Sequence, residues 1–166
     1  MKSQAGKVRV VYKNFVVHPE RVMPAHLAGC AAGKQGKFLE FKHAWWTKAY
    51  AAHKLGEPTI LAIAKDIGLD MAKFDADRKG DQCKQQIGAD MKELNKFGVN
   101  GTPSFFINGK FTMFSGPGPL KAMIDQAAAD VGSSGVPAAQ YYQKVVLEQG
   151  LKKFRSKKDA TKAKGG

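Results

Sequence analysis

The sequence predicts an α/β domain with a short mixed sheet and a long helical insertion. Residues 7–15 alternate and are β-branched, and residues 104–114 carry a hairpin pattern. Between these two strand patterns, over about residues 22–97, lie several helical patterns in succession. Consecutive helices between two strands are typical of an insertion rather than of alternating strand–helix units. We therefore expect residues 1–150 to form one domain.

The first predicted element is the strand over residues 7–15. Val8, Val10 and Tyr12 share one side of it, which predicts a buried face on that side. The strand should end before Pro19, because the residue that precedes a proline avoids the helical conformation.

Five helices should follow this strand. The helical patterns cover, in order, residues 24–32, 37–54, 60–67, 71–78 and 81–97. In the second of them Phe38, Phe41 and Trp45 fall on one stripe, as expected of a helix with one buried face. Asp70 stands directly before the fourth helix, where its carboxylate can accept the first free backbone N–H groups.

A β-hairpin is predicted after the last of these helices. Residues 104–107 are aromatic and branched, as a half-buried strand prefers, and residues 110–114 form the return strand. Asn108-Gly109 supplies the two positive-φ positions of a tight two-residue turn. Pro103 cannot extend the ladder, so it marks the start of the strand. Taken alone, Thr102-Pro103 is an ordinary turn before a hairpin.

The chain should end with two helices and a basic tail. The helices are predicted over residues 119–129 and from Pro137 onward. Residues 151–166 are rich in Lys, Ala and Gly and should be disordered. From Lys152 onward seven basic residues and one acidic residue account for +6 of the net charge of +13. A basic tail on a folded domain is most often only solvated, so nucleic-acid binding is not predicted.

Composition restricts the class of protein. The chain has 166 residues, of which 43% are hydrophobic and 25% charged, as is ordinary for a globular domain with a real core. No apolar run approaches the roughly 20 residues that cross a bilayer. No secretory signal peptide is visible at the start of the sequence, so it leaves the compartment unassigned.

Two stretches resemble the DsbA-like branch of the thioredoxin superfamily. Residues 101–109, Gly-Thr-Pro-Ser-Phe-Phe-Ile-Asn-Gly, resemble the cis-proline loop and following hairpin of that family. Residues 8–15, His18-Pro19 and residues 31–40 are similar to its second core strand and first inserted helices. The resemblance implies a thioredoxin-like fold and a cis Thr102–Pro103 bond. It also implies that Gly101, Thr102 and Pro103 bind extended protein or peptide substrates that contain cysteine.

The same resemblance implies parts that the sequence does not contain. The first core strand and the Cys-x-x-Cys of that family should precede Val8, yet the sequence has no Cys-x-x-Cys. Family members are often extracytoplasmic thiol–disulfide oxidoreductases. This chain by itself should therefore be inactive as an oxidoreductase, since exchange needs an attacking thiolate and a nearby resolving thiol.

A missing central strand would leave backbone groups on both sides of it unpaired, at about 1–3 kcal/mol for each buried group. An upstream segment, a strand exchanged with a second copy, or the C-terminal region could fill the gap, the last being disfavoured because residues 141–154 look helical. The alternative function is a non-catalytic peptide-binding or protein-binding module, which could be a strand-swapped dimer.

The two cysteines, Cys30 and Cys83, lie far apart in the sequence and form no recognisable pair. Cys83 falls in the first turn of a predicted helix next to Lys84, which makes it the better candidate for a reactive thiol. The simpler interpretation is an ordinary half-packed cysteine, and for Cys30 a small buried apolar residue.

No metal site or cofactor is expected. His26 and Cys30 are four residues apart and could share one helix face, but two ligands are too few for zinc. The sequence also lacks a glycine-rich loop that could hold phosphate groups.

Overall fold

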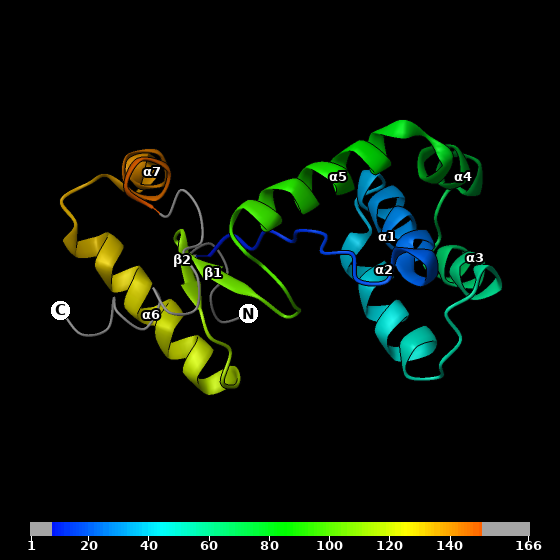
Figure 1. The fold of residues 1–166 in the computed structure, drawn as a ribbon, viewed down its shortest axis with the longest axis horizontal. Coiled ribbons are helices and arrows are strands. Elements are labelled where there is room, and N and C mark those ends of the chain that lie inside the picture. Colours follow the sequence, from blue (N-terminus) through cyan, green and yellow to red (C-terminus); the bar gives the residue numbers. More distant parts are fainter. Residues whose placement is uncertain (1–7, 151–166) are drawn as a thin grey trace. The chain divides into compact units, whose positions relative to one another are not determined.

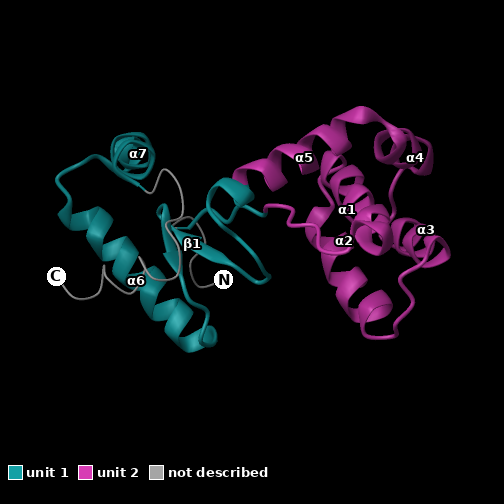
Figure 2. Cartoon of the chain, in the orientation of Figure 1, with its two compact units in different colours: residues 1–12, 94–166 teal, residues 13–93 magenta. Residues whose placement is uncertain are grey.

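The computed structural model describes residues 8–150, and it is mostly helical (Figure 1). Its helices and its one small sheet fall into two compact units (Figure 2). Unit 2 comprises residues 13–93, and unit 1 comprises residues 1–12 and 94–166. The predicted disordered tail at 151–166 lies outside the described residues.

Unit 2 is a bundle of helices. These are α1 (Pro19–Lys34), α2 (Phe38–Ala44), the π-helical segment η2 (Trp45–Tyr50), α3 (Glu57–Asp66), α4 (Met71–Lys79) and most of α5 (Asp81–Lys96). All five predicted helices are present. The first begins at Pro19 rather than near Pro24, because a proline is tolerated in the first turn of a helix.

The core of unit 2 combines small and large side chains. Ala28, Ala31 and Ala32 of α1 are fully buried, which lets neighbouring helices approach α1 closely. Large apolar side chains of the other helices fill the remaining space; they include Phe41, Ile60, Ile63 and Phe74. The Asp70 carboxylate caps α4 as predicted, since its Oδ1 accepts the backbone N–H groups of Ala72 and Lys73 at 3.0 and 3.1 Å.

Unit 1 holds the sheet. Strand β1 (Phe105–Ile107) pairs antiparallel with β2 (Lys110–Thr112), with Phe106 opposite Phe111. Asn108 and Gly109 both have positive φ, which confirms the predicted turn. After the hairpin come α6 (Pro117–Ser133), α7 (Ala138–Tyr141) and the π-helical segment η3 (Tyr142–Leu147).

The predicted strand over residues 7–15 is wrong for the part that the structure describes. Residues 8–16 have no regular secondary structure, and the described sheet contains only β1 and β2. Val8, Val10 and Tyr12, which the alternation placed on a buried face, are 36%, 46% and 42% exposed. A strand forms only when a neighbouring strand exchanges backbone hydrogen bonds with it, and the sheet of the described residues pairs only β1 with β2.

Among residues 8–150, no helix is both long enough and apolar enough to cross a membrane.

Candidate functional site

The loop over residues 101–104 connects α5 to the sheet. Thr102 and Pro103 are exposed, while Gly101 and Ser104 are half-buried. The Thr102–Pro103 peptide bond is cis, as predicted. The Ser104 hydroxyl donates a hydrogen bond to the Gly101 carbonyl at 2.7 Å, which closes the loop on itself. The loop therefore presents Thr102 and Pro103 to solvent immediately before β1.

Strand β1 adds an open edge to this loop. Within residues 8–150, β1 pairs with β2 alone, so its second edge has no strand partner there. Its three side chains are half-buried, and the exposed Phe114 stacks on Phe105 with the ring centroids 5.2 Å apart. An unpaired strand edge beside apolar side chains is a surface onto which an extended peptide can add as a further strand.

A cleft of about 410 Å³ lies on the hairpin, away from the loop. Ile107 and Thr112 of the hairpin, Met123 and Asp130 of α6, and Tyr141 of α7 are among the residues that line it. The cleft thus borders the turn end of the hairpin and does not include Thr102 or Pro103.

The cysteines are joined in a disulfide that sequence analysis did not anticipate. Cys30 of α1 and Cys83 of α5 are bonded, with their Cα atoms 5.8 Å apart although 53 positions separate them in the sequence. Cys83 is fully buried, and Cys30 is half-buried. In this structure Cys83 is therefore not a free thiol, and its role as a reactive thiol remains a prediction for the reduced protein.

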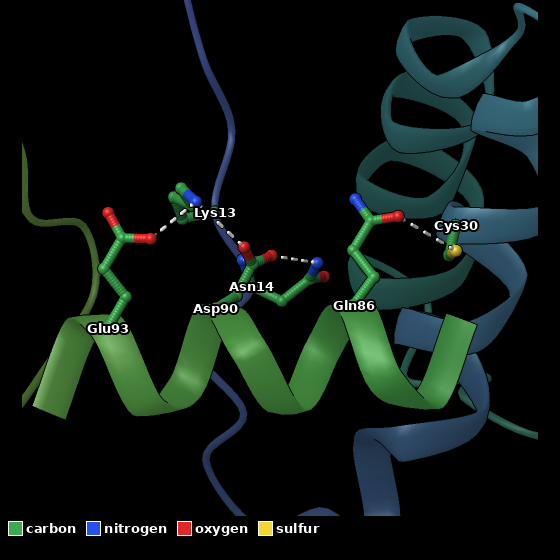
Figure 3. Close-up of polar contacts among 6 residues, drawn as sticks. All are labelled: Lys13, Asn14, Cys30, Gln86, Asp90 and Glu93. Atoms are coloured by element: carbon green, nitrogen blue, oxygen red, sulfur yellow. Dashed lines mark hydrogen bonds and ion pairs between the residues drawn. The ribbon is translucent and has the colours of Figure 1, made fainter. Parts of the chain in front are cut away.

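A polar cluster holds the segment before α1 against α5 (Figure 3). Asp90 is 5% exposed, and its Oδ2 accepts the backbone N–H and the side-chain Nδ2 of Asn14 at 2.9 and 2.8 Å. Its Oδ1 lies 3.2 Å from Nζ of Lys13, which also reaches the exposed Glu93 at 2.9 Å. This hydrogen bond to Glu93, more than the contact with Asp90, raises the pKa of Lys13 although burial opposes it.

Asn14 connects this cluster to α1. Because its Nδ2 donates to Asp90, its Oδ1 is left to accept from Nδ1 of His26, 2.9 Å away. The amide therefore fixes a hydrogen on Nδ1 of the imidazole. Sequence analysis missed Asn14 and Asp90. The signal that could have found Asp90 is its place on the inner face of the helix, since Cys83, Ile87 and Asp90 follow one another at helical spacing and are all buried.

Burial also lowers the pKa of His26 below its ordinary value. In the unfolded chain His26 takes up a proton near its ordinary pKa of about 6.5, whereas in the folded chain it does so only at lower pH. The folded state therefore loses stability relative to the unfolded state as the pH falls from about 6.5 toward the lower pKa. We expect a lower urea midpoint at about pH 5.5 than at about pH 7.5. In the His26→Gln variant this difference should shrink, and in the variant of the exposed His43, His43→Gln, it should persist. An equal loss in both variants would contradict the assignment to His26.

Within residues 8–150, no group of three or more His, Cys, Asp and Glu side chains is placed to hold a metal ion. His26 and Cys30 do share α1, but the sulfur of Cys30 is bonded to Cys83 and is not a thiolate ligand in this state. The predicted loop residues 101–103 belong to unit 1, and both cysteines belong to unit 2.

Comparisons with known proteins bear on about three quarters of the chain. A family model described as thioredoxin matches residues 1–126. The chain is also 27% identical over 103 residues to a Na(+)/H(+) antiporter, NhaA, of Herminiimonas arsenicoxydans. That match covers 62% of this chain but only 16% of the antiporter, so the chain spans a small part of that relative's length. No solved structure matches the chain significantly.

Proposed function

The chain belongs to the thioredoxin family, and on that premise we propose that it is a DsbA-like member whose Gly101–Pro103 loop binds extended protein or peptide chains. The observation that carries this proposal is the exposed loop that leads straight into β1, a strand with one open edge among the described residues. A bound chain could pair its backbone with this edge and pack a side chain on the exposed Phe114, which stacks on Phe105 of β1.

Thiol–disulfide exchange is the reaction expected of a DsbA-like protein. It needs a thiolate and a resolving thiol, which a Cys-x-x-Cys supplies at the start of a helix. The sequence contains no such motif, and its two cysteines are bonded to one another inside unit 2. We propose that this chain by itself binds substrates without turning them over, because the sequence supplies no Cys-x-x-Cys.

Binding can be measured with a reduced and alkylated insulin B chain that carries a fluorophore, followed by anisotropy. The variant Thr102→Arg places bulk and charge on the exposed loop and should weaken binding about tenfold or more, equivalent to roughly 1.4 kcal/mol. The variant Ala139→Arg adds the same charge at an exposed position of α7 and should bind as the unchanged protein does.

Two results would contradict this proposal. Equal affinities of the Thr102→Arg and Ala139→Arg variants would show that the loop does not contact the peptide. Reduction of native insulin at a rate comparable with a thioredoxin that has a Cys-x-x-Cys would show that the chain is catalytic without that motif.

A strand-swapped dimer is the second candidate, and one observation favours it. Val8, Val10 and Val11 are exposed, and the sheet of the described residues, β1 and β2, does not include them. Exchange of this segment between two copies would pair its backbone and cover its side chains. Light scattering that gives the mass of two chains would support the dimer, and the mass of a single chain would exclude it.

A further inference from the structure

The two cysteines of the disulfide between α1 and α5 differ in their exposure to solvent. Cys83 is fully buried on the inner face of α5, whereas Cys30 retains partial exposure. The Cys30 Sγ lies 3.9 Å from Oε1 of Gln86 (Figure 3), and Gln86 is itself exposed. Solvent therefore borders the Cys30 side of the bond, while the Cys83 side is closed.

We propose that this disulfide is an exchange site for small thiols, with Cys30 as the sulfur that is attacked and Cys83 as the leaving group. This site is distinct from the Gly101–Pro103 loop and does not depend on the peptide-binding function proposed for that loop. It would place a redox-sensitive modification site in the helical unit.

The chemistry is ordinary thiol–disulfide exchange. The thiolate of a small thiol such as glutathione forms a bond to the Cys30 Sγ, and the bond between the two protein sulfurs breaks. Its electron pair leaves on the Cys83 Sγ, which then takes a proton from water. A second thiolate attacks the glutathione sulfur of the mixed disulfide and releases Cys30. In total, two small thiols are oxidised to one disulfide, and the protein disulfide is reduced to two thiols.

Two features of α5 act on the leaving group. Cys83 is the third residue of this 16-residue helix, where free backbone N–H groups and the helix dipole stabilise a thiolate. Burial of Cys83 opposes that charge, which favours rapid protonation once the bond has opened.

Cys30 is stabilised differently. After reduction its thiol can donate a hydrogen bond to the Gln86 oxygen, a bond that the oxidised sulfur cannot make because it carries no hydrogen.

The experiment uses the full chain under native conditions. The oxidised protein is incubated with reduced glutathione, then unfolded and alkylated with N-ethylmaleimide at mildly acid pH, where exchange is slow, and digested for mass spectrometry. We expect glutathione on the Cys30 peptide and the alkyl group on the Cys83 peptide, with the opposite arrangement at least about tenfold rarer. Repeating the incubation in urea is the control, since both sulfurs are then accessible and the preference should disappear.

Two outcomes would overturn the proposal. Adducts found equally on both cysteines of the native protein would show that exposure does not direct the attack. A native protein that shows no adduct, while the protein in urea does, would show that the disulfide is purely structural. The single variants provide a second measurement: the lone Cys30 in Cys83→Ala should react with a thiol reagent while folded, and the lone Cys83 in Cys30→Ala should react at least about tenfold more slowly.

Discussion

Replacing Cys30 and Cys83 together by alanine is expected to lower the free energy of unfolding by about 4 kcal/mol. The disulfide closes a loop between positions 53 apart in the sequence, which lowers the conformational entropy of the unfolded chain. Without the bond the unfolded chain regains this entropy, so the folded state becomes less stable. Alanine is the appropriate replacement because Cys83 is fully buried, so a serine hydroxyl there would add an unrelated cost.

The chain has two compact units, so a signal from the whole chain would mix the unfolding of both. The effect on unit 2 is therefore measured in urea by monitoring hydrogen exchange of backbone amides in α1 and α5. A reducing agent provides the matched control: it should destabilise the unchanged protein by a similar amount and leave the double variant unaffected. A loss below about 1 kcal/mol would mean that the helices hold α5 in place without the disulfide.

The second large effect is expected at Asp90, at the other end of the buried face of α5. Asp90→Ala should cost about 2–4 kcal/mol, because it leaves the backbone N–H and the side-chain Nδ2 of Asn14 without their acceptor in a partly buried place, while Lys13 keeps only the exposed Glu93. Asn14 would also lose the bond that orients its amide toward His26.

Glu93→Ala is the matched control for this prediction. Glu93 lies on the same helix and pairs with the same Lys13, but its side chain is 52% exposed, so its loss should cost less than about 1 kcal/mol. Thermal unfolding of both variants against the unchanged protein gives the comparison. Similar losses for the two variants would show that the Asp90 contacts contribute no more than a surface ion pair does.

The two predictions concern the same element. At its start α5 is bonded to α1 through Cys83, and near residue 90 it binds the segment that precedes α1. Exchange at the disulfide would therefore free the first turns of α5 while the Asp90 contacts persist. Hydrogen exchange that rises around Cys83 upon reduction but not around Asp90 would separate the two attachments.

Short-range features of this protein could be predicted from its sequence. The Asn108-Gly109 turn and the Asp70 cap are correct because each depends on backbone conformation and hydrogen bonds within a few residues. The five helices of unit 2 are correct for the same reason, since apolar spacing along one stretch indicates both the helix and its buried face. The cis Thr102–Pro103 bond was expected from resemblance rather than from local chemistry.

The tertiary structure alone decided the features that join distant residues. No spacing rule pairs Cys30 with Cys83, and Asp90 becomes an acceptor for Asn14 only because folding brings residues 76 positions apart together. The segment over residues 8–15 has a strand-like sequence yet forms no strand within the described chain. Alternating side chains express a preference for a sheet surface, but a strand exists only where a partner supplies the opposite half of its backbone hydrogen bonds.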